Sequence, residues 1–288
     1  MASPLRLTHV SHRAMATDFV AYLPPHVPQY SVDRALDALE ELDRIEARLT
    51  VYRPDSDVSK INASAGIAAV RVDAMTLRLI RRSIELSRRS EGRFDITAGP
   101  LVDAWGFGMR RGRKPNDQEI AAATALVGYE KIEIDETRSS VHLPLSGMKI
   151  NLGAIGKGFA LDFIADRFRC EDIDDFLIHG GASSVIASGN PLASDDPADN
   201  PGDDRDEDHG RAPIDGGDVA WTVGVAHPTK PKRSVGQIKL RDAAMATSGS
   251  GKQFFHHRGK RYGHVIDPRS GYPAGELLSL TLITKSAT

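Results

Sequence analysis

The chain has 288 residues, of which 40% are hydrophobic and 26% charged, a composition typical of a globular protein with one large core or two small ones. Its net charge of −2 hides an asymmetry: residues 190–220 hold ten acidic residues against Arg205 and Arg211, so the rest carries about +6. That balance suits a small anionic ligand and excludes the strongly basic charge of nucleic-acid-binding proteins. Cys170 is the only cysteine, which excludes an intrachain disulfide and a multi-cysteine zinc site.

The first residues carry no targeting signal that can be recognised. Met1 to Arg6 leads into no apolar signal segment and no lipoprotein cysteine. No later stretch approaches the roughly 18 continuous apolar residues of a transmembrane helix. As given, the sequence predicts a cytoplasmic protein.

The first half of the chain predicts helices and strands in alternation. Alternating apolar residues predict a strand over Thr8–Leu23, and Ser31 is a helix N-cap that precedes an apolar face ending near Tyr52. The spacing of apolar residues predicts a second helix over Ala74–Arg89. A short third helix is predicted after Pro115-Asn116. Two strands are then expected, followed by a glycine-rich turn and another helix: Lys131–Ile134, Ser139–Leu143 and Lys157–Phe168.

The second half predicts mainly strands. They are expected at Asp175–Ile178, Ser184–Ala187, Trp221–Ala226, Gly236–Leu240, Ala243–Thr247, Arg261–Ile266 and Leu278–Ile283. Residues 190–218 are acidic, rich in Pro and Gly and poor in aliphatic residues, so they predict a disordered loop insertion. Calcium binding by this loop is the alternative, although the EF-hand spacing is absent. Long helices with late antiparallel strands predict an α+β fold in a single compact domain.

The glycine-rich turn Asn151-Leu152-Gly153-Ala154-Ile155-Gly156-Lys157-Gly158 is built from residues suited to a phosphate ligand. Its glycines let the backbone approach a ligand, and Lys157 adds a positive charge beside the amide groups of a helix start. It is not a P-loop, because Asn151 stands where that motif needs glycine and Gly158 where it needs Ser or Thr. The spacing also fails the dinucleotide fingerprint G-x-G-x-x-G. A tight strand-to-helix turn without a ligand is the alternative.

Five further stretches combine unusual side chains between the regular elements. They are Met15-Ala16-Thr17-Asp18-Phe19, Tyr52-Arg53-Pro54-Asp55-Ser56-Asp57, Gly92-Arg93-Phe94-Asp95-Ile96-Thr97, Gly99-Pro100-Leu101-Val102-Asp103-Ala104-Trp105-Gly106-Phe107-Gly108 and His264-Val265-Ile266-Asp267-Pro268-Arg269-Ser270-Gly271-Tyr272-Pro273. With the glycine-rich turn, their order and spacing resemble the ApbE family, the FAD:protein FMN transferases, from about Met15 to the last residue. The resemblance implies an α+β fold related to the T-fold, with mixed sheets packed with helices.

The resemblance also implies an activity. Family members are magnesium-dependent flavin transferases that split FAD, attach FMN through a phosphoester to a Ser or Thr of a target protein and release AMP. Attack by a hydroxyl on a pyrophosphate needs charge neutralisation, alignment and removal of the hydroxyl proton, and these residues agree with that need. The implied substrate is FAD, the implied metal is Mg²⁺, and the implied partner is a target protein with a Ser/Thr motif.

Several roles follow from the resemblance at matching positions. Met15 and Tyr52 match residues that contact the flavin nucleotide, with a place in the core as the alternative for each. Arg93, Phe94 and Asp95 match the segment that holds the adenosine end of FAD. Packing is the alternative for Phe94, and a helix N-cap or turn role is the alternative for Asp95.

The glycine-rich turn matches the pyrophosphate and magnesium corner of the family. Lys157 matches the lysine beside the pyrophosphate, with a solvated lysine at a helix start as the alternative. Ala154 matches a position whose backbone carbonyl binds magnesium. Asn151 stands where many members have Asp, which keeps hydrogen bonding and removes one negative charge. Ser248, in a Thr-Ser-Gly turn, matches a phosphate contact, with a turn hydroxyl as the alternative.

The last motif carries the proposed proton chemistry. His264 matches a residue near the FAD phosphates and the acceptor hydroxyl, so it is the candidate general base or phosphate partner. A histidine whose hydrogen bonds are purely structural, at the end of a strand, is the alternative. Val265 is expected to contact the nucleotide, and Asp267 is a candidate catalytic residue or a turn former before Pro268. Gly180 and Gly181 fit either a backbone close to the flavin or a tight turn.

The sequence departs from the family at its end. In the family, the strand that corresponds to Leu278–Ile283 is followed by an Asp-Ala-x-x-Thr helix that completes the magnesium site, and this sequence stops at Thr288 before it. Two expected ligands are therefore missing. A non-catalytic FAD-binding protein and a pyrophosphatase that cleaves FAD are the alternatives to the transferase.

Overall fold

The computed structural model describes residues 7–108, 112–181, 183–192, 219–230, 233–250, 253–275 and 277–288. Most of the predicted acidic loop 190–218 lies outside the described residues. The helices of this part are α1 (Gln29–Leu49), α2 (Asp57–Ala63), α3 (Ala74–Arg89), α4 (Gly99–Ala104), α5 (Asp117–Ala125), the 3-10 helix η1 (Tyr129–Lys131) and α6 (Gly156–Cys170). The strands are β1 (Thr8–Ala14), β2 (Thr17–Leu23), β3 (Val70–Arg71), β4 (Glu133–Asp135), β5 (Ser140–His142), β6 (Phe176–Gly180), β7 (Ser184–Ser188), β8 (Trp221–Ala226), β9 (Ser234–Leu240), β10 (Ala243–Ser248), β11 (Phe254–His257), β12 (Lys260–Gly263), β13 (Ile266–Asp267), β14 (Tyr272–Pro273) and β15 (Leu280–Thr284).

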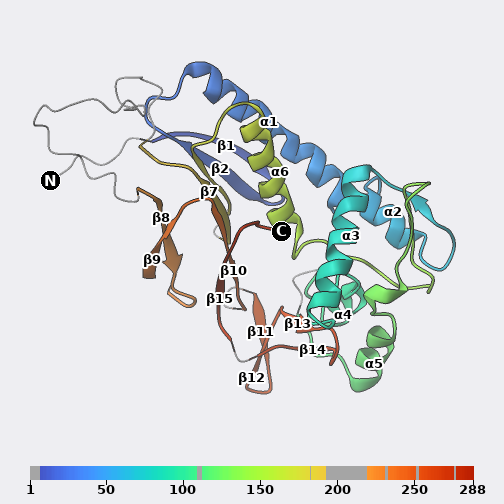
Figure 1. Ribbon diagram of the computed structural model, residues 1–288. Coiled ribbons are helices and arrows are strands. Elements are labelled where there is room, and N and C mark those ends of the chain that lie inside the picture. Colours follow the sequence, from blue (N-terminus) through green and yellow to red (C-terminus); the bar gives the residue numbers. More distant parts are fainter. Residues whose placement is uncertain are drawn as a thin grey trace, which may run out of the picture. The chain divides into compact units, whose positions relative to one another are not determined.

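Helices together with separate sheets of antiparallel strand pairs confirm the α+β fold class (Figure 1). The chain forms two compact units, each assembled from separate stretches of sequence. The first unit comprises residues 1–42, 160–247 and 281–288, and the second comprises residues 43–159 and 248–280. The chain passes from one unit to the other within α1, α6, β10 and β15.

The first unit is built on a sheet. Among the described residues, six strands pair in the order β1-β2-β6-β7-β10-β15. One core cluster joins this sheet to the β8–β9 hairpin, and its buried members are Leu177, Val185, Ala187, Trp221, Leu240 and Met245. The Trp221 indole donates a hydrogen bond to the Ser188 carbonyl at 2.8 Å, so its only polar atom is satisfied. Helix α6 packs through Phe168 edge-on against Phe176 of β6, at 5.2 Å between ring centroids.

The prediction of a single strand over Thr8–Leu23 is wrong. The segment is a hairpin, β1 and β2, in which Ala14 pairs with Thr17. Met15 and Ala16 form the turn with φ of 51° and 56°, the left-handed region in which glycine or asparagine is usual. Because neither residue is a typical turn former, the alternation of apolar residues concealed the turn. Met15 therefore lies at the tip of a hairpin.

The second unit holds helices α2 to α5 and short sheets. Strands β3, β5 and β4 pair in that order, and β11–β12 and β13–β14 are two hairpins. Helix α3 has the predicted bounds, and the Asp73 carboxylate caps it by accepting a hydrogen bond from the Met75 N–H. Helix α5 begins at a capping box formed by Asn116 and Glu119, which confirms the helix expected after Pro115. Trp105, Phe107, Ile120 and Tyr262 form a core cluster of this unit.

A buried carboxylate ties α2 to α3. The Asp57 side chain is 4% exposed. Its Oδ2 accepts hydrogen bonds from the Asp73 N–H at 3.0 Å and from the Thr76 hydroxyl at 2.7 Å. Arg48 Nη1 lies 3.5 Å from its Oδ1. Asp57, the last residue of the motif Tyr52-Arg53-Pro54-Asp55-Ser56-Asp57, thus has a structural role.

We expect Asp57→Ala to lower the free energy of unfolding by about 2–4 kcal/mol, because buried donors and a guanidinium lose their acceptor. Urea unfolding measures this change. Asp55→Ala is the matched control, since the Asp55 side chain is 66% exposed and pairs only with Arg53 among the described residues. It should cost less than about 1 kcal/mol. Equal effects of the two variants on the free energy of unfolding would contradict the structural role of Asp57.

Candidate functional site

The glycine-rich turn between Ile150 and α6 folds back through its own hydrogen bonds. The Asn151 side chain accepts a hydrogen bond from the Gly153 N–H at 2.8 Å, and the Leu152 carbonyl accepts one from Gly156 at 2.7 Å. Leu152 and Ile155 point inward and are 1% and 6% exposed. Ala154 between them is exposed. The turn therefore has an apolar underside and an open backbone face.

Neighbouring residues hold both flanks of the segment that enters the turn. The Asn62 amide of α2 donates to the Ile150 carbonyl at 3.0 Å and accepts from the Ile150 N–H at 2.8 Å, as a paired strand would. On the other flank, the Ile96 carbonyl accepts from the Asn151 N–H at 2.8 Å. A Cβ on Gly99 would lie 2.7 Å from the Lys149 carbonyl oxygen, so only glycine allows this approach. The turn is fixed before any ligand arrives.

The start of α6 has backbone donors without an acceptor. No described residue accepts a hydrogen bond from the N–H of Lys157 or Gly158, which belong to the first turn of α6. The Lys157 ammonium is half-buried and has no hydrogen-bond or ion-pair partner among the described residues. Two free amides, a helix N-terminus and a lysine together favour an anionic ligand such as phosphate.

The segment of Arg93, Phe94 and Asp95 lies directly before Ile96, the residue that holds Asn151. Asp95 Oδ1 accepts hydrogen bonds from the Thr97 N–H and hydroxyl at 2.8 and 2.7 Å, and Oδ2 accepts one from the Tyr129 N–H at 2.9 Å. Burial raises the pKa of the Asp95 carboxyl, and these hydrogen bonds only partly offset the shift. Of the alternatives for Asp95, the turn role is present in the structure.

The other two residues of that segment differ in exposure. Phe94 is half-buried, and its N–H donates to the Ser90 hydroxyl at 3.1 Å. The Arg93 side chain is 57% exposed and pairs with Glu91 at 2.7 Å. An exposed guanidinium with a flexible partner is free to exchange that partner for a ligand.

His264 is held in one orientation by backbone atoms. Its N–H and its ring Nδ1 both lie 3.2 Å from the Gln253 carbonyl oxygen. Because a carbonyl only accepts, Nδ1 carries the proton in this contact, and in the neutral imidazole the lone pair is then on Nε2. No described residue bonds to Nε2, and the ring stands edge-on to Phe107 at 6.5 Å. The geometry gives His264 the form that a general base needs.

Asp267 is committed to its own turn. Its Oδ1 accepts from the Arg269 N–H and Nε, both at 3.0 Å, and its Oδ2 accepts from Arg269 Nη2 at 2.8 Å. The Arg269 guanidinium holds the pKa of the Asp267 carboxyl below its ordinary value. The turn role expected before Pro268 is present, and a catalytic role for Asp267 stays a prediction. Val265 nearby receives the Ala274 N–H on its carbonyl at 2.8 Å.

The remaining predicted residues lie apart from these. The Tyr52 side chain is 80% exposed, so it is not a core residue, and Met15 at its hairpin tip is half-buried. Ser248 is exposed at the end of β10. A Cβ on Gly249 would lie 2.5 Å from the Leu278 carbonyl oxygen, which explains the glycine of the Thr-Ser-Gly turn. Gly181 has φ of 63°, so its tight-turn role is present.

The second unit thus holds all the predicted site residues except Met15, Gly180 and Gly181. The structure joins the Asp95 segment to the glycine-rich turn through Ile96. Sequence reasoning missed Asn62, Thr97 and Gln253, which position these residues. Asn62 bonds to a residue 88 positions away, so no local pattern signals its role.

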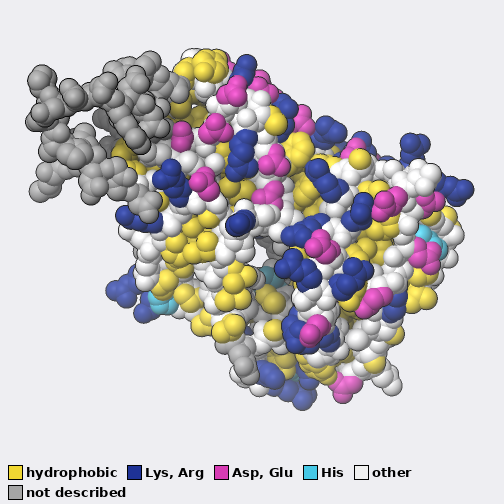
Figure 2. All heavy atoms as spheres, in the orientation of Figure 1, with side chains coloured by type: hydrophobic (Ala, Val, Ile, Leu, Met, Phe, Trp, Pro, Cys, Tyr) yellow, Lys and Arg dark blue, Asp and Glu magenta, His cyan; other side chains and the backbone are white. Residues whose placement is uncertain are grey.

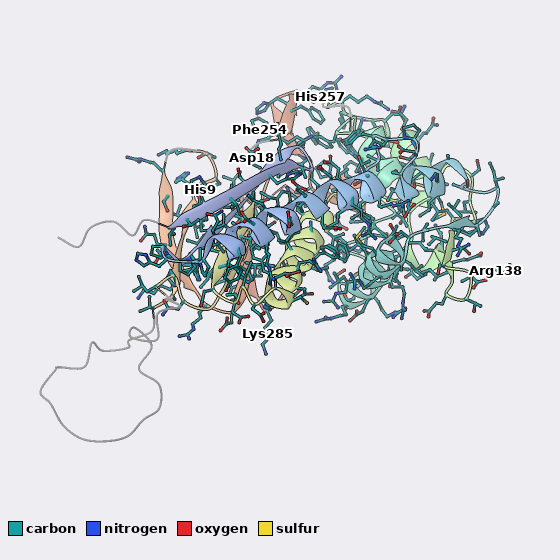
Figure 3. All side chains as sticks on the ribbon, turned by 90° about the horizontal axis from the view of Figure 1, so that it is seen from above. His9, Asp18, Arg138, Phe254, His257 and Lys285 are labelled. Carbon is teal, nitrogen blue, oxygen red and sulfur yellow. The ribbon has the colours of Figure 1, made fainter. Side chains whose placement is uncertain are left out.

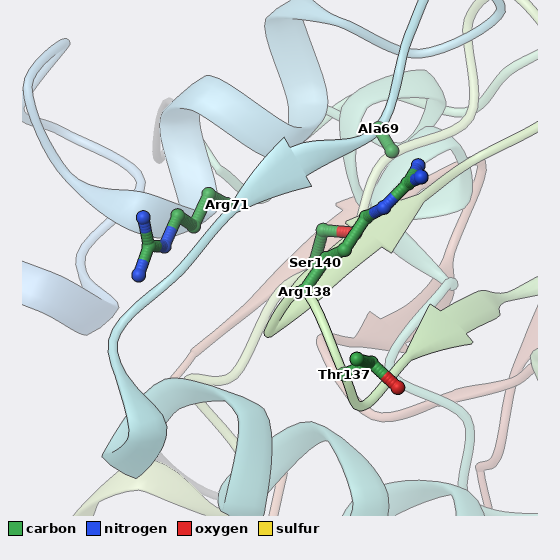
Figure 4. Close-up of a pocket in the computed structure, with 5 residues that line it drawn as sticks. All are labelled: Ala69, Arg71, Thr137, Arg138 and Ser140. Atoms are coloured by element: carbon green, nitrogen blue, oxygen red, sulfur yellow. The ribbon is translucent and has the colours of Figure 1, made fainter.

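A separate pocket of about 510 Å³ lies beside β3 and β5. Figure 4 shows its lining residues Ala69, Arg71, Thr137, Arg138 and Ser140. The two arginine side chains point in different directions, and Arg138 lies 3.7 Å from Asp135. None of the predicted site residues lines it, so this pocket is not the candidate site.

The available side-chain and backbone ligand atoms decide how the site can bind a metal ion. No group of three or more His, Cys, Asp or Glu side chains placed to hold a metal ion occurs in the part of the chain that the structure describes. The Ala154 carbonyl accepts no backbone hydrogen bond from a described residue, so it is a free oxygen donor. Mg²⁺ keeps several waters and binds phosphate oxygens with few protein ligands. The residues present therefore fit Mg²⁺ held mainly by a phosphate ligand and water.

No helix of the described residues is long and apolar enough to cross a membrane.

Solved structures resemble this fold closely. The crystal structure of the ApbE protein of Thermotoga maritima matches with a TM-score of 0.79 and 27% identity, over 98% of this chain and 83% of that one. The apo form of the flavinyl transferase ApbE of Pseudomonas stutzeri matches with a TM-score of 0.75 and 26% identity, over 98% of this chain and 81% of that one.

Relatives found by sequence similarity point to the same family as the solved structures. The FAD:protein FMN transferase of Vibrio cholerae is 29% identical over 98% of this chain and 78% of the relative. The FAD:protein FMN transferase of Klebsiella pneumoniae is 31% identical over 88% of this chain and 72% of the relative. The model of the ApbE family matches residues 15–288. The chain belongs to the ApbE family.

Proposed function

We propose that this protein transfers FMN from FAD to a Ser or Thr hydroxyl of a target protein, forms a phosphoester bond and releases AMP in a magnesium-dependent reaction. Family membership supports flavin transfer. The observation that carries the proposal is the pre-formed turn with free N–H groups at Lys157 and Gly158 and an unpartnered Lys157 ammonium. These donors suit the pyrophosphate of FAD, whose negative charge must be neutralised before a hydroxyl can attack.

In the proposed reaction, the acceptor oxygen attacks the phosphorus on the FMN side of the pyrophosphate. A new oxygen–phosphorus bond forms, the bridging phosphorus–oxygen bond breaks, and AMP leaves with that electron pair. His264 Nε2 takes the hydroxyl proton, since its lone pair is free when Nδ1–H donates to Gln253. Lys157 and the two amides stabilise the charge on the phosphate oxygens.

The other residues bind and orient the substrate in this proposal. Tyr52 and Met15 contact the flavin, and the segment Arg93–Asp95 holds the adenosine end. Asn151 and Ser248 donate hydrogen bonds to FAD, and Val265 offers it an apolar contact. Mg²⁺, held by FAD phosphate oxygens, water and the Ala154 carbonyl, supplies further charge neutralisation when bound.

A single assay separates this function from its alternatives. The protein is incubated with FAD, Mg²⁺ and a target protein with an accessible Ser/Thr motif, and flavin fluorescence is recorded in a denaturing gel. We expect a fluorescent target band that depends on Mg²⁺. Retention of FAD without a band would identify a binding protein. Release of AMP without a band would identify a pyrophosphatase.

Asn62→Ala tests whether the fixed turn matters for binding. We expect the variant to bind FAD about tenfold more weakly, because the segment entering the turn loses the two hydrogen bonds that hold Ile150. Fluorescence titration measures the affinity. Asn116→Ala is the matched control, since it also removes a side-chain hydrogen bond to the backbone, at the cap of α5. If both variants lose stability but neither loses affinity, Asn62 supports only the fold.

A further inference from the structure

The β11–β12 hairpin has one face that packs on the second unit. Phe255 and Tyr262, which pair across the strands, stack at 5.4 Å between ring centroids. Tyr262 also lies 5.4 Å from Trp105, and Phe255 lies 5.7 Å from Phe107. Arg258 and Gly259 form the tight turn with φ of 49° and 76°. The hairpin is therefore a rigid support for its other face.

The opposite face is aromatic and cationic. The Arg261 guanidinium lies 4.1 Å from the ring centroid of Phe254 and donates to the Ser250 carbonyl, so its position is fixed. Phe254 is 42% exposed and lies 5.4 Å from the exposed His256. Figure 3 labels Phe254 and His257 on this hairpin. An exposed ring beside a fixed guanidinium is typical of a protein-binding surface.

The hairpin carries no negative charge of its own. Residues 248–266 contain no Asp or Glu. Arg258 lies at the turn, and Lys260 is the first residue of β12, with its ammonium 5.6 Å from the Tyr262 ring centroid. Both residues are exposed and have no carboxylate partner among the described residues. In Figure 2, Lys and Arg side chains gather at the lower edge of the view, where Figure 1 places this hairpin. The surface thus lacks the carboxylate partners that most arginines in the described part of the chain have.

The hairpin is also joined to the candidate general base. Strand β11 begins one residue after Gln253, whose carbonyl holds both the N–H and the ring of His264. The Gln253 amide donates to the Phe107 carbonyl at 3.2 Å, which fixes the base of the hairpin. A protein bound along the hairpin would therefore be placed beside His264.

We propose that the outer face and turn of this hairpin, formed by Phe254, His256, Arg258, Lys260 and Arg261, dock an acidic, extended segment of the target protein. This inference rests on the proposed function, because the docked segment is the one that brings its hydroxyl to His264. Carboxylates of the target pair with Arg258 and Lys260, and an apolar side chain covers Phe254. The hairpin thus selects the protein substrate, while the glycine-rich turn binds FAD.

The double variant Arg258→Glu/Lys260→Glu tests the docking surface. We expect the KM for the target protein to rise at least about tenfold, with kcat and the Kd for FAD within about twofold of the wild type. The KM of the wild type should rise with salt and that of the variant should not. Replacing acidic residues of the target segment with Lys should restore activity with the variant. The matched control is Lys230→Glu/Lys239→Glu, which makes the same charge change on the β8–β9 hairpin and should leave the KM unchanged.

Three results would overturn the docking surface: an unchanged KM, an equal rise in KM for the control, or a loss of FAD affinity in the double variant. If the wild type labels no target at all, the proposed function fails, and docking is then measured alone by fluorescence anisotropy. A Ser-containing acidic peptide should bind the wild type at least tenfold more tightly than the same peptide with Asn and Gln for Asp and Glu. Equal binding of the two peptides, or binding only to phosphatidylserine vesicles or single-stranded DNA, would overturn the inference.

Discussion

Lys157→Ala is expected to weaken FAD binding by about 10- to 100-fold, because a charge-assisted hydrogen bond contributes about 1.5–3 kcal/mol. Lys157 has no partner among the described residues, so its removal breaks no internal contact and the fold should be unaffected. The free N–H groups of Lys157 and Gly158 remain in the variant, since they belong to the backbone. Residual affinity is therefore expected rather than complete loss.

Isothermal titration with FAD and with riboflavin measures this effect and its cause. Riboflavin lacks the phosphates, so its affinity should be the same for the variant and the wild type. Lys149→Ala is the matched control, because Lys149 lies just before the turn but pairs with Asp103 at 2.6 Å. An unchanged FAD affinity of Lys157→Ala, or an equal loss with Lys149→Ala, would refute the phosphate role of Lys157.

His264→Ala is expected to lower kcat for FMN transfer by about 10²- to 10⁴-fold, the usual contribution of a general base, while FAD binding changes little. Single-turnover labelling of the target measures the chemical step. His9→Ala is the control, since His9 is exposed on β1 (Figure 3) and the resemblance gives it no role. A variant that keeps kcat but loses FAD affinity would make His264 a phosphate ligand and not a base.

The pH dependence distinguishes His264 from Asp267. Arg269 lowers the folded pKa of Asp267, so the stabilisation by this carboxylate is complete above its ordinary value of 3.8 and is lost only as the pH falls through the lowered pKa. Asp267 thus stays ionised near neutral pH. Any pH dependence of the activity near neutral pH should therefore persist in Asp267→Asn and disappear in His264→Ala. Its disappearance in Asp267→Asn instead would assign the base role to Asp267.

Local signals predicted the regular elements well. Helix α3 has the expected bounds because its apolar face repeats over sixteen residues and Asp73 caps it. Helices α2 and α4, of seven and six residues, are too short for such a repeat and were missed. The hairpin at Met15 was missed because its turn contains neither Gly nor Asn at the positions with positive φ.

The candidate site was predictable in part. The motif residues could be named because their order and spacing resemble a family, and the family match confirms that resemblance. The residues that position these motif residues could not be named. Asn62, Thr97 and Gln253 act through hydrogen bonds to residues distant in sequence or by fixing the orientation of a side chain. The exposure of Tyr52 and the commitment of Asp267 to Arg269 likewise depend on tertiary contacts.

The central claim is that FMN moves from FAD to a protein hydroxyl. Intact-mass spectrometry of the target after incubation with the protein, FAD and Mg²⁺ tests it most directly, together with quantification of AMP in the same sample. The account predicts a mass increase equal to one FMN less one water, one AMP released per modified target, and no increase when the acceptor Ser or Thr is replaced with Ala. AMP release with an unmodified target, or bound FAD with neither product, would contradict it.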